Sequence, residues 1–216
     1  MNALSKTDQR LERIGGISGI LSIVFYFSVA VLSFIPDAVA LLVAFAFPLL
    51  WIVAFMGLYR FLKAENHTAS LEIGYLFGII GAALACTFLV VQQANFIWHE
   101  QALEGATTEE AIGLALAAFR GANRVQAGMD VAFDIFITIS WLLFGLNIAR
   151  STHFPRLLGW VGSALAAGLL VLNMTTFPDA PAEAGLFDLG PFLGMWSLIF
   201  FIWFTRVAYR KETKKN

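Results

Sequence analysis

The sequence predicts an all-α membrane protein, a single domain over residues 1–216 that forms a polytopic bundle of six transmembrane helices. Hydrophobic residues make up 59% of the chain and charged residues 13%, whereas soluble domains average about 45–50% and about 25%. The apolar stretches have the roughly 20 residues that a helix needs to cross a bilayer core. This length excludes barrel strands, which need only about 10 residues. The lipid bilayer is therefore the first predicted partner.

The predicted spans are separated by short polar segments, except between the third and the fourth. They run approximately over residues 14–35, 38–62, 71–98, 125–149, 157–177 and 189–208. The first follows basic residues, as a signal peptide does, but it is longer than a usual signal-peptide core and has no clear cleavage site. We interpret it as a retained helix.

The orientation follows from the distribution of Lys and Arg, which are enriched in cytoplasmic loops. With six spans, all of the 14 Lys and Arg residues except Arg120 and Arg124 fall on the side of the termini. Both termini are therefore predicted to be cytoplasmic.

The long connection after the third span contains Thr107 and Glu110 at capping-box spacing, followed by apolar residues on one helical face. It predicts a short helix on the outer membrane surface; a solvated connector is the alternative.

Two carboxylates interrupt the fourth span. Asp130 and Asp134 lie four residues apart, with Gln126 and Thr138 continuing the same face. A charge near the centre of a membrane helix costs about 2.5–3.5 kcal/mol on insertion scales. This face is therefore expected to point towards protein or a water-filled cavity, although a buried network that only locks the helices together is the alternative.

Other polar side chains are predicted at the same depth, in the outer half of the bundle. The candidate ligand-binding residues are Tyr26, Gln92, Asn95, His99, Gln126, Asp130, Asp134, Thr138, Asn173 and Trp196. The inner halves of the spans are almost wholly apolar. The pattern predicts an acidic pocket that is open to the outside and closed towards the cytoplasm.

Several chemistries lack the residues that they need. The chain has only three His, and two of them, His67 and His153, lie in predicted inner loops, which excludes a three-histidine zinc hydrolase and bis-histidine haem within the bilayer. No Lys lies within a span, which excludes a retinal Schiff base. A mononuclear metal at His99 and the aspartates is conceivable, but we predict neither metal nor cofactor. No basic stripe with interleaved aromatic residues indicates nucleic acid.

Small residues recur at helical spacing, which permits close helix contact. The pairs are Gly15 with Gly19, Gly74 with Gly78, and Gly159 with Gly162 and Ser163. Contact within the bundle is the favoured interpretation, and a homodimer through these glycine-rich faces is the alternative.

The stretches VAFDIFITISWLLFGLNIARSTHFPRLLGWVG and FPDAPAEAGLFDLGPFLGMW resemble an uncharacterised family of small bacterial integral membrane proteins, a domain of unknown function. The resemblance is best over the last three spans. It implies a multi-pass protein of the bacterial cytoplasmic membrane and supplies no activity or site residues.

Three functions follow from the sequence as hypotheses. The first is binding of a small polar or cationic ligand, in which Asp130 and Asp134 supply the counter-charge or carry a proton, as in a transporter or a proton-linked protein. The second is a membrane enzyme that uses the aspartates as acid and base on a lipid-linked substrate. The third is a structural or accessory subunit. Binding is favoured over catalysis because no nucleophile or metal cage is evident.

Overall fold

The predicted six-helix architecture is confirmed. In the computed structural model, the backbone is described for residues 6–31 and 37–213 and the side chains for residues 9–28, 39 and 41–210. The described chain forms α1 (Lys6–Val31), α2 (Asp37–Glu65), α3 (Ala69–Gly105), α4 (Glu109–Arg150), α5 (Arg156–Thr176) and α6 (Gly190–Thr213). It contains no strand, and all six of these helices are long and apolar enough to cross a membrane. The predicted end of the first span, residues 32–35, lies outside the described residues.

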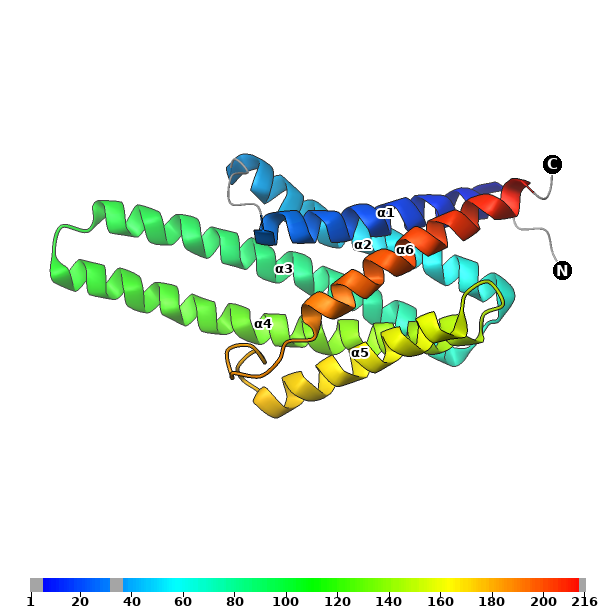
Figure 1. The fold of residues 1–216 in the computed structure, drawn as a ribbon. Helices are drawn as coiled ribbons and strands as arrows, with labels where there is room; N and C mark the ends of the chain where they lie inside the picture. The colour runs from blue at the N-terminus through cyan, green and yellow to red at the C-terminus, as the bar shows by residue number, and fades with distance from the viewer. Residues whose placement is uncertain (1–5, 32–36, 214–216) are drawn as a thin grey trace.

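The helices are arranged as a closed ring. Each packs against its neighbours in the chain, and α1 also packs against α6, where the Arg13 guanidinium lies 5.3 Å from the centre of the Tyr209 ring. The start of α1 and the end of α6 lie at one end of the bundle (Figure 1). We call this the termini end, and the opposite end, where α3 connects to α4, the hairpin end. The cytoplasmic location of the termini end stays a prediction.

Aromatic side chains fill the centre of the termini-end half. Trp141 of α4 is fully buried, and its ring packs edge-on against Phe55 at 5.3 Å and Trp196 at 5.2 Å between centroids. Phe200 and Phe144 complete this cluster. Edge-to-face pairs suit the quadrupoles of the rings, so the cluster closes this half of the bundle with dense packing.

Small residues allow the closest helix contacts within the bundle. A Cβ on Gly15 would meet the backbone of Gly57 at 2.7 Å, and one on Gly159 would meet the backbone of Ala149 at 2.3 Å. Gly74 and Gly78 face α4, and Gly162 faces the Trp196 ring. The glycine faces are therefore used inside the chain, as the favoured interpretation predicts, and nothing in the structure supports a homodimer through them.

The predicted surface helix between the third and fourth spans is wrong. Residues 109–150 form one continuous helix, and its N-cap is Thr108 rather than Thr107. At 1.5 Å per residue, α3 and α4 are about 55 and about 63 Å long, so they extend past a bilayer core of about 30 Å as a helical hairpin (Figure 1). The extension packs on itself: the Asn95 side chain donates to Asn123 Oδ1 at 2.8 Å and to the Phe119 carbonyl at 3.2 Å. Phe119 packs against Phe96 and His99 of α3, whereas Ile112 and Leu114 of the extension stay exposed.

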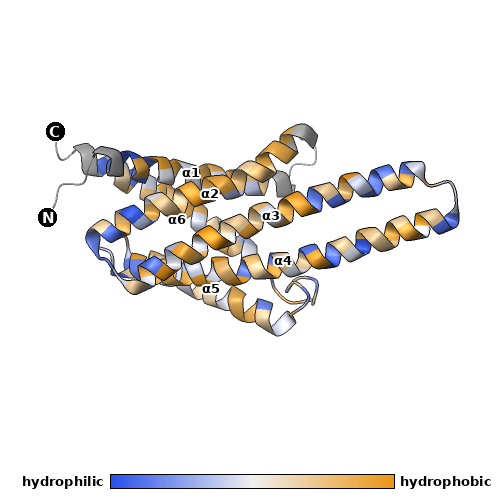
Figure 2. Cartoon of the chain, turned by 180° about the vertical axis from the view of Figure 1, so that it is seen from behind, coloured by the Kyte–Doolittle hydropathy of each residue, from blue (hydrophilic) through white to orange (hydrophobic). Residues whose placement is uncertain are grey.

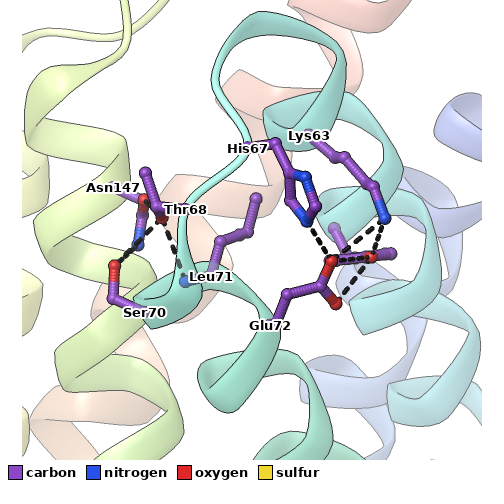
Figure 3. A network of polar contacts seen from close by, with 8 residues as sticks. Lys63, His67, Thr68, Ser70, Leu71, Glu72 and Asn147 are labelled. Carbon is purple, nitrogen blue, oxygen red and sulfur yellow. Dashed lines mark hydrogen bonds and ion pairs between the residues drawn. The ribbon is translucent and has the colours of Figure 1, made fainter.

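Polar residues gather at both ends of the bundle, with an apolar belt between them (Figure 2). At the termini end, Glu72 of α3 accepts hydrogen bonds from Tyr59 at 2.7 Å and Lys63 at 3.0 Å and also contacts His67 (Figure 3). Beside this network, the Thr68 hydroxyl donates to Asn147 Oδ1 at 2.8 Å. These bonds fix the α2–α3 connection against α4 where polar groups can reach water.

Candidate ligand-binding cavity

A cavity lies in the hairpin-end half of the bundle, surrounded by all six described helices. Its central part has a volume of about 340 Å³ and is lined by residues of α1 to α6 and of the α5–α6 loop. A side part of about 360 Å³ lies between α3, α4, α5 and that loop. Both parts are lined by Gln92, Gln126, Asp130 and Asp134, so they adjoin at the predicted carboxylates. We call the two parts together the hairpin-end cavity.

Acidic groups supply all of the charge on the described lining of this cavity. Asp130 and Asp134, which we call the aspartate pair, are joined by Asp188 at the start of α6 and by Glu183 in the α5–α6 loop. No Lys, Arg or His is among the described lining residues. The cavity therefore carries a negative field that a cation would neutralise.

The helix geometry explains how the aspartate pair faces the cavity. The four-residue spacing places both carboxylates on one side of α4, and the neighbouring Val131 and Ile137 turn towards buried packing. Both aspartates are only partly buried, because their side chains point into open space. The sequence prediction that this face points inward is consistent with this placement.

An amide from α5 meets the aspartate pair across the cavity. Asn173 is 1% exposed and lines the side part together with Asp134. Its amide interacts with Asp134, yet its nitrogen has no hydrogen-bond partner of normal geometry among the described residues. A buried polar group without a partner is uncommon in folded proteins. Asn173 thus places a buried amide beside the Asp134 carboxylate.

Aromatic side chains form the opposite wall of the central part. Tyr26, Phe47, Phe88 and Phe133 come from α1, α2, α3 and α4, and we call them the aromatic wall. In α2, Pro48 has no N–H to offer the carbonyl of Ala44, and Ala44 lines the cavity. Interrupted backbone bonding at membrane depth is tolerated where the helix borders a cavity.

Four of the predicted site residues lie away from the lining of the cavity. Asn95 and His99 belong to the α3–α4 extension, where the His99 ring stacks on Phe119 with centroids 4.2 Å apart. Thr138 is fully buried and donates to the Asp134 carbonyl of its own helix at 2.6 Å. The Trp196 indole donates to the Leu158 carbonyl at 3.0 Å in the termini-end half. Tyr26, Gln92, Gln126, Asp130, Asp134 and Asn173 are brought together.

The sequence prediction missed the contribution of α2 and of the α5–α6 loop. Phe47, Ala44 and Pro181 line the cavity, and none of them is polar enough to stand out in an apolar span. Pro48 was the available signal, since proline inside a membrane helix is tolerated where neighbouring groups or a cavity satisfy the backbone. Asp188 accepts a 2.7 Å hydrogen bond from the Gly190 N–H and also lines the cavity.

The described residues contain no group of three or more His, Cys, Asp or Glu side chains placed to hold a metal ion. The carboxylates of the cavity are therefore spread around its wall and do not form a compact ligand cage.

Residues 38–207 match the family of the domain of unknown function DUF4386. The chain belongs to this family, which confirms the resemblance seen in the sequence over α2 to α6. Comparisons with curated proteins and with solved structures found no match. With its six membrane-crossing helices, the chain is a multi-pass membrane protein of a family with unknown function.

Proposed function

We propose that this membrane protein binds a small cationic ligand in the hairpin-end cavity, with the aspartate pair as its counter-charge. The observation that carries the proposal is the all-acidic charge of the described lining. Carboxylates at this depth are costly unless they serve a purpose, and intramembrane acids commonly mark ligand or ion sites. A ligand cation would offset the repulsion among the acidic groups.

Binding from the hairpin side is better supported than passage through the protein. Below the cavity, the cluster around Trp141, Phe55 and Phe200 fills the bundle with side chains that are almost or fully buried. Translocation would require this cluster to separate. By the positive-inside rule the hairpin end faces outward, so the ligand would enter from outside the cytoplasmic membrane.

The proposal is tested by ligand-dependent thermal stabilisation of the purified protein in lipid nanodiscs. Choline, spermidine and tetramethylammonium chlorides would be compared with NaCl at equal ionic strength. A ligand at about 100 times its Kd stabilises the folded state by about 2.7 kcal/mol. At least one organic cation should raise Tm in the unmodified chain and should lose this effect in Asp130→Asn/Asp134→Asn.

The matched control is Glu104→Gln, which removes a carboxylate from the exposed α3 extension. This variant should keep the stabilisation. An equal rise of Tm in the Asn double variant would mean that the cations act elsewhere, and the absence of any cation-dependent rise in the unmodified chain would refute cation binding.

A further inference from the structure

Beyond the aspartate pair, the cavity continues towards the termini end as a smaller space. This deep chamber has a volume of about 80 Å³. Its rim includes Phe47, Phe133 and Asp134, which also line the central part. Along α4 its lining continues from Asp134 to Ile137 and Trp141. The two spaces therefore meet at Asp134, and the deep chamber lies on the termini-end side of this residue.

Aliphatic side chains from three helices border the deep chamber below its rim. They are Ile23 of α1, Ile137 of α4 and Leu193 of α6, and each is at most 5% exposed. Of the described cavities, these three residues line only the deep chamber. No charged residue other than Asp134 is among its described lining. The acidic lining of the cavity therefore ends at Asp134 and gives way to hydrocarbon.

The polar groups below the rim are already bonded or hidden. The Ser197 hydroxyl donates to the Leu193 carbonyl at 2.8 Å, and the indole nitrogens of Trp51 and Trp141 are buried away from the chamber surface. A buried water typically makes about three hydrogen bonds to polar groups. Because the deeper lining does not supply them, the chamber suits an apolar group better than water.

The size of the deep chamber limits the apolar group that can fill it. Its volume of about 80 Å³ lies between the shares of two and three liquid waters at about 30 Å³ each. A methylene group is about as large as a water molecule, so the chamber holds about three carbon atoms in a row. It is too small for a whole ligand, and a ring does not fit.

The aromatic wall decides what kind of cation suits the space above. Phe47, Phe88 and Phe133 line the same central space as the aspartate pair. An ammonium group over an aromatic face is attracted by the ring quadrupole, and quaternary ammonium groups are recognised in this way. A small hydrated metal ion gains little from such a wall, whereas an alkylated ammonium can contact both the rings and the carboxylates.

We propose that the ligand is an organic ammonium ion with its cationic head at the aspartate pair and a short, straight alkyl chain in the deep chamber. The chain enters below Asp134 because the two spaces meet there, so the head stays beside the carboxylates. This inference rests on the proposed cation binding and names the class of ligand. It stands on two separate features, the acidic and aromatic central part and the apolar chamber below it.

A series of alkyltrimethylammonium ions with one chain from methyl to hexyl measures the length of the chamber. Their Kd values would be determined by titration calorimetry on the full chain in nanodiscs, with the heat of partition into empty nanodiscs subtracted. Each methylene up to propyl should lower Kd about threefold to fourfold, as burial of a CH₂ group permits. Longer chains should gain nothing further, whereas partition into lipid continues to rise with every methylene.

Two variants on different helices enlarge the chamber. In Leu193→Ala or in Ile23→Ala, the chain length beyond which Kd stops falling should move from propyl to butyl or pentyl, while tetramethylammonium keeps its Kd. The two variants are independent, so loss of folding in one leaves the other as a test. Leu198→Ala is the matched control on α6, because Leu198 lines none of the described cavities, and it should leave the chain-length dependence unchanged.

The outcomes distinguish this inference from the proposed function. If all members bind with the same Kd, or if Kd falls steadily through hexyl, the chain does not lie in the deep chamber, and cation binding stands. A break that stays at propyl in both enlarged variants also refutes the chamber. If no member binds, or if Asp130→Asn/Asp134→Asn leaves every Kd unchanged, both proposals fail.

Discussion

The termini-end and hairpin-end halves of the bundle differ in what their polar side chains face. In the termini-end half, the Ser140 hydroxyl donates to the Gly74 carbonyl at 2.7 Å, Asn147 donates to the Leu143 carbonyl at 2.8 Å, and the Trp196 indole donates to the Leu158 carbonyl. In the hairpin-end half, Gln92, Gln126 and the aspartate pair line the hairpin-end cavity.

This difference indicates what each half does. Buried polar groups that are hydrogen-bonded within the protein make a rigid scaffold, and natural proteins depart from such local rules mainly at functional sites. The termini-end half therefore has the pairing of a scaffold, and under the proposed function the polar groups of the hairpin-end half hold the ligand. The carboxylates show the same contrast, since Glu72 is held by Tyr59 and Lys63, whereas no Lys, Arg or His is among the described residues that line the cavity around the aspartate pair.

The largest expected effect comes from tight packing in the termini-end half. A Cβ on Gly159 would lie 2.3 Å from the Ala149 backbone nitrogen, so Gly159→Ala must push α5 away from α4. We expect this variant to lower the free energy of unfolding by about 3 kcal/mol. Reversible unfolding in mixed micelles measures the change.

Gly128→Ala is the matched control in the hairpin-end half, because a Cβ there meets nothing within 4 Å. It should be neutral or stabilising by up to about 1 kcal/mol, as alanine favours a helix over glycine. Equal losses at both positions would remove the packing difference between the halves.

A smaller effect of opposite sign is expected from neutralising carboxylates. Asp134→Asn removes a charge from the bundle interior that has no ion-pair partner among the described residues. It should raise the free energy of unfolding by about 1–2 kcal/mol, part of the cost of an intramembrane charge. The same unfolding experiment measures it.

Glu72→Gln is the counterpart at the termini end and should lower stability, because it weakens the bonds to Tyr59, Lys63 and His67 (Figure 3). A loss of stability in Asp134→Asn comparable to that in Glu72→Gln would show that the aspartate belongs to a locking network. That result would favour the structural hypothesis over ligand binding.

The smallest effect is local and concerns the α3–α4 extension. Asn95→Ala removes the hydrogen bonds to Asn123 and Phe119, at a cost of about 1 kcal/mol. Amide exchange should speed up in residues 109–124 and stay unchanged in α5. Gln93→Ala is the neighbouring control, and equal acceleration there would show that the Asn95 contacts do not hold the extension together.

The fold could be predicted from the sequence because membrane helices are recognised by the length and the apolar composition of their segments. Each predicted span agrees with a described helix within its membrane-crossing part. The extension could not be predicted because the same apolar residues, such as Ile112 and Phe119, fit a membrane surface and a helical hairpin equally well. The surface helix and the hairpin differ only in what the segment packs against. That contact, such as the hydrogen bond between Asn95 and Asn123, joins residues 28 positions apart, so local sequence patterns do not reveal it.

Of the residues that line the cavity, only the polar ones could be predicted from the sequence. The spacing of Asp130 and Asp134 on one helical face indicated the cavity, and Gln92 and Asn173 followed from their depth. The depth of Trp196 in its span wrongly predicted that it lines the cavity, because its indole instead donates to the Leu158 carbonyl of α5. The aromatic wall was missed because Phe47 and Phe88 look like ordinary lipid-facing residues until the helices are packed.

The most direct test of the central claim is the accessibility of the two halves from outside. In a Cys86→Ser background, a cysteine would replace Gln126, which lines the cavity, or Phe144, which is fully buried in the termini-end half. In intact cells, a membrane-impermeant thiol reagent should label Gln126→Cys rapidly and leave Phe144→Cys unlabelled. A cationic ligand should slow the labelling of Gln126→Cys. Equal protection of both positions, or labelling of Gln126→Cys only after the cytoplasmic side is exposed, would contradict a cavity that opens outward at the hairpin end.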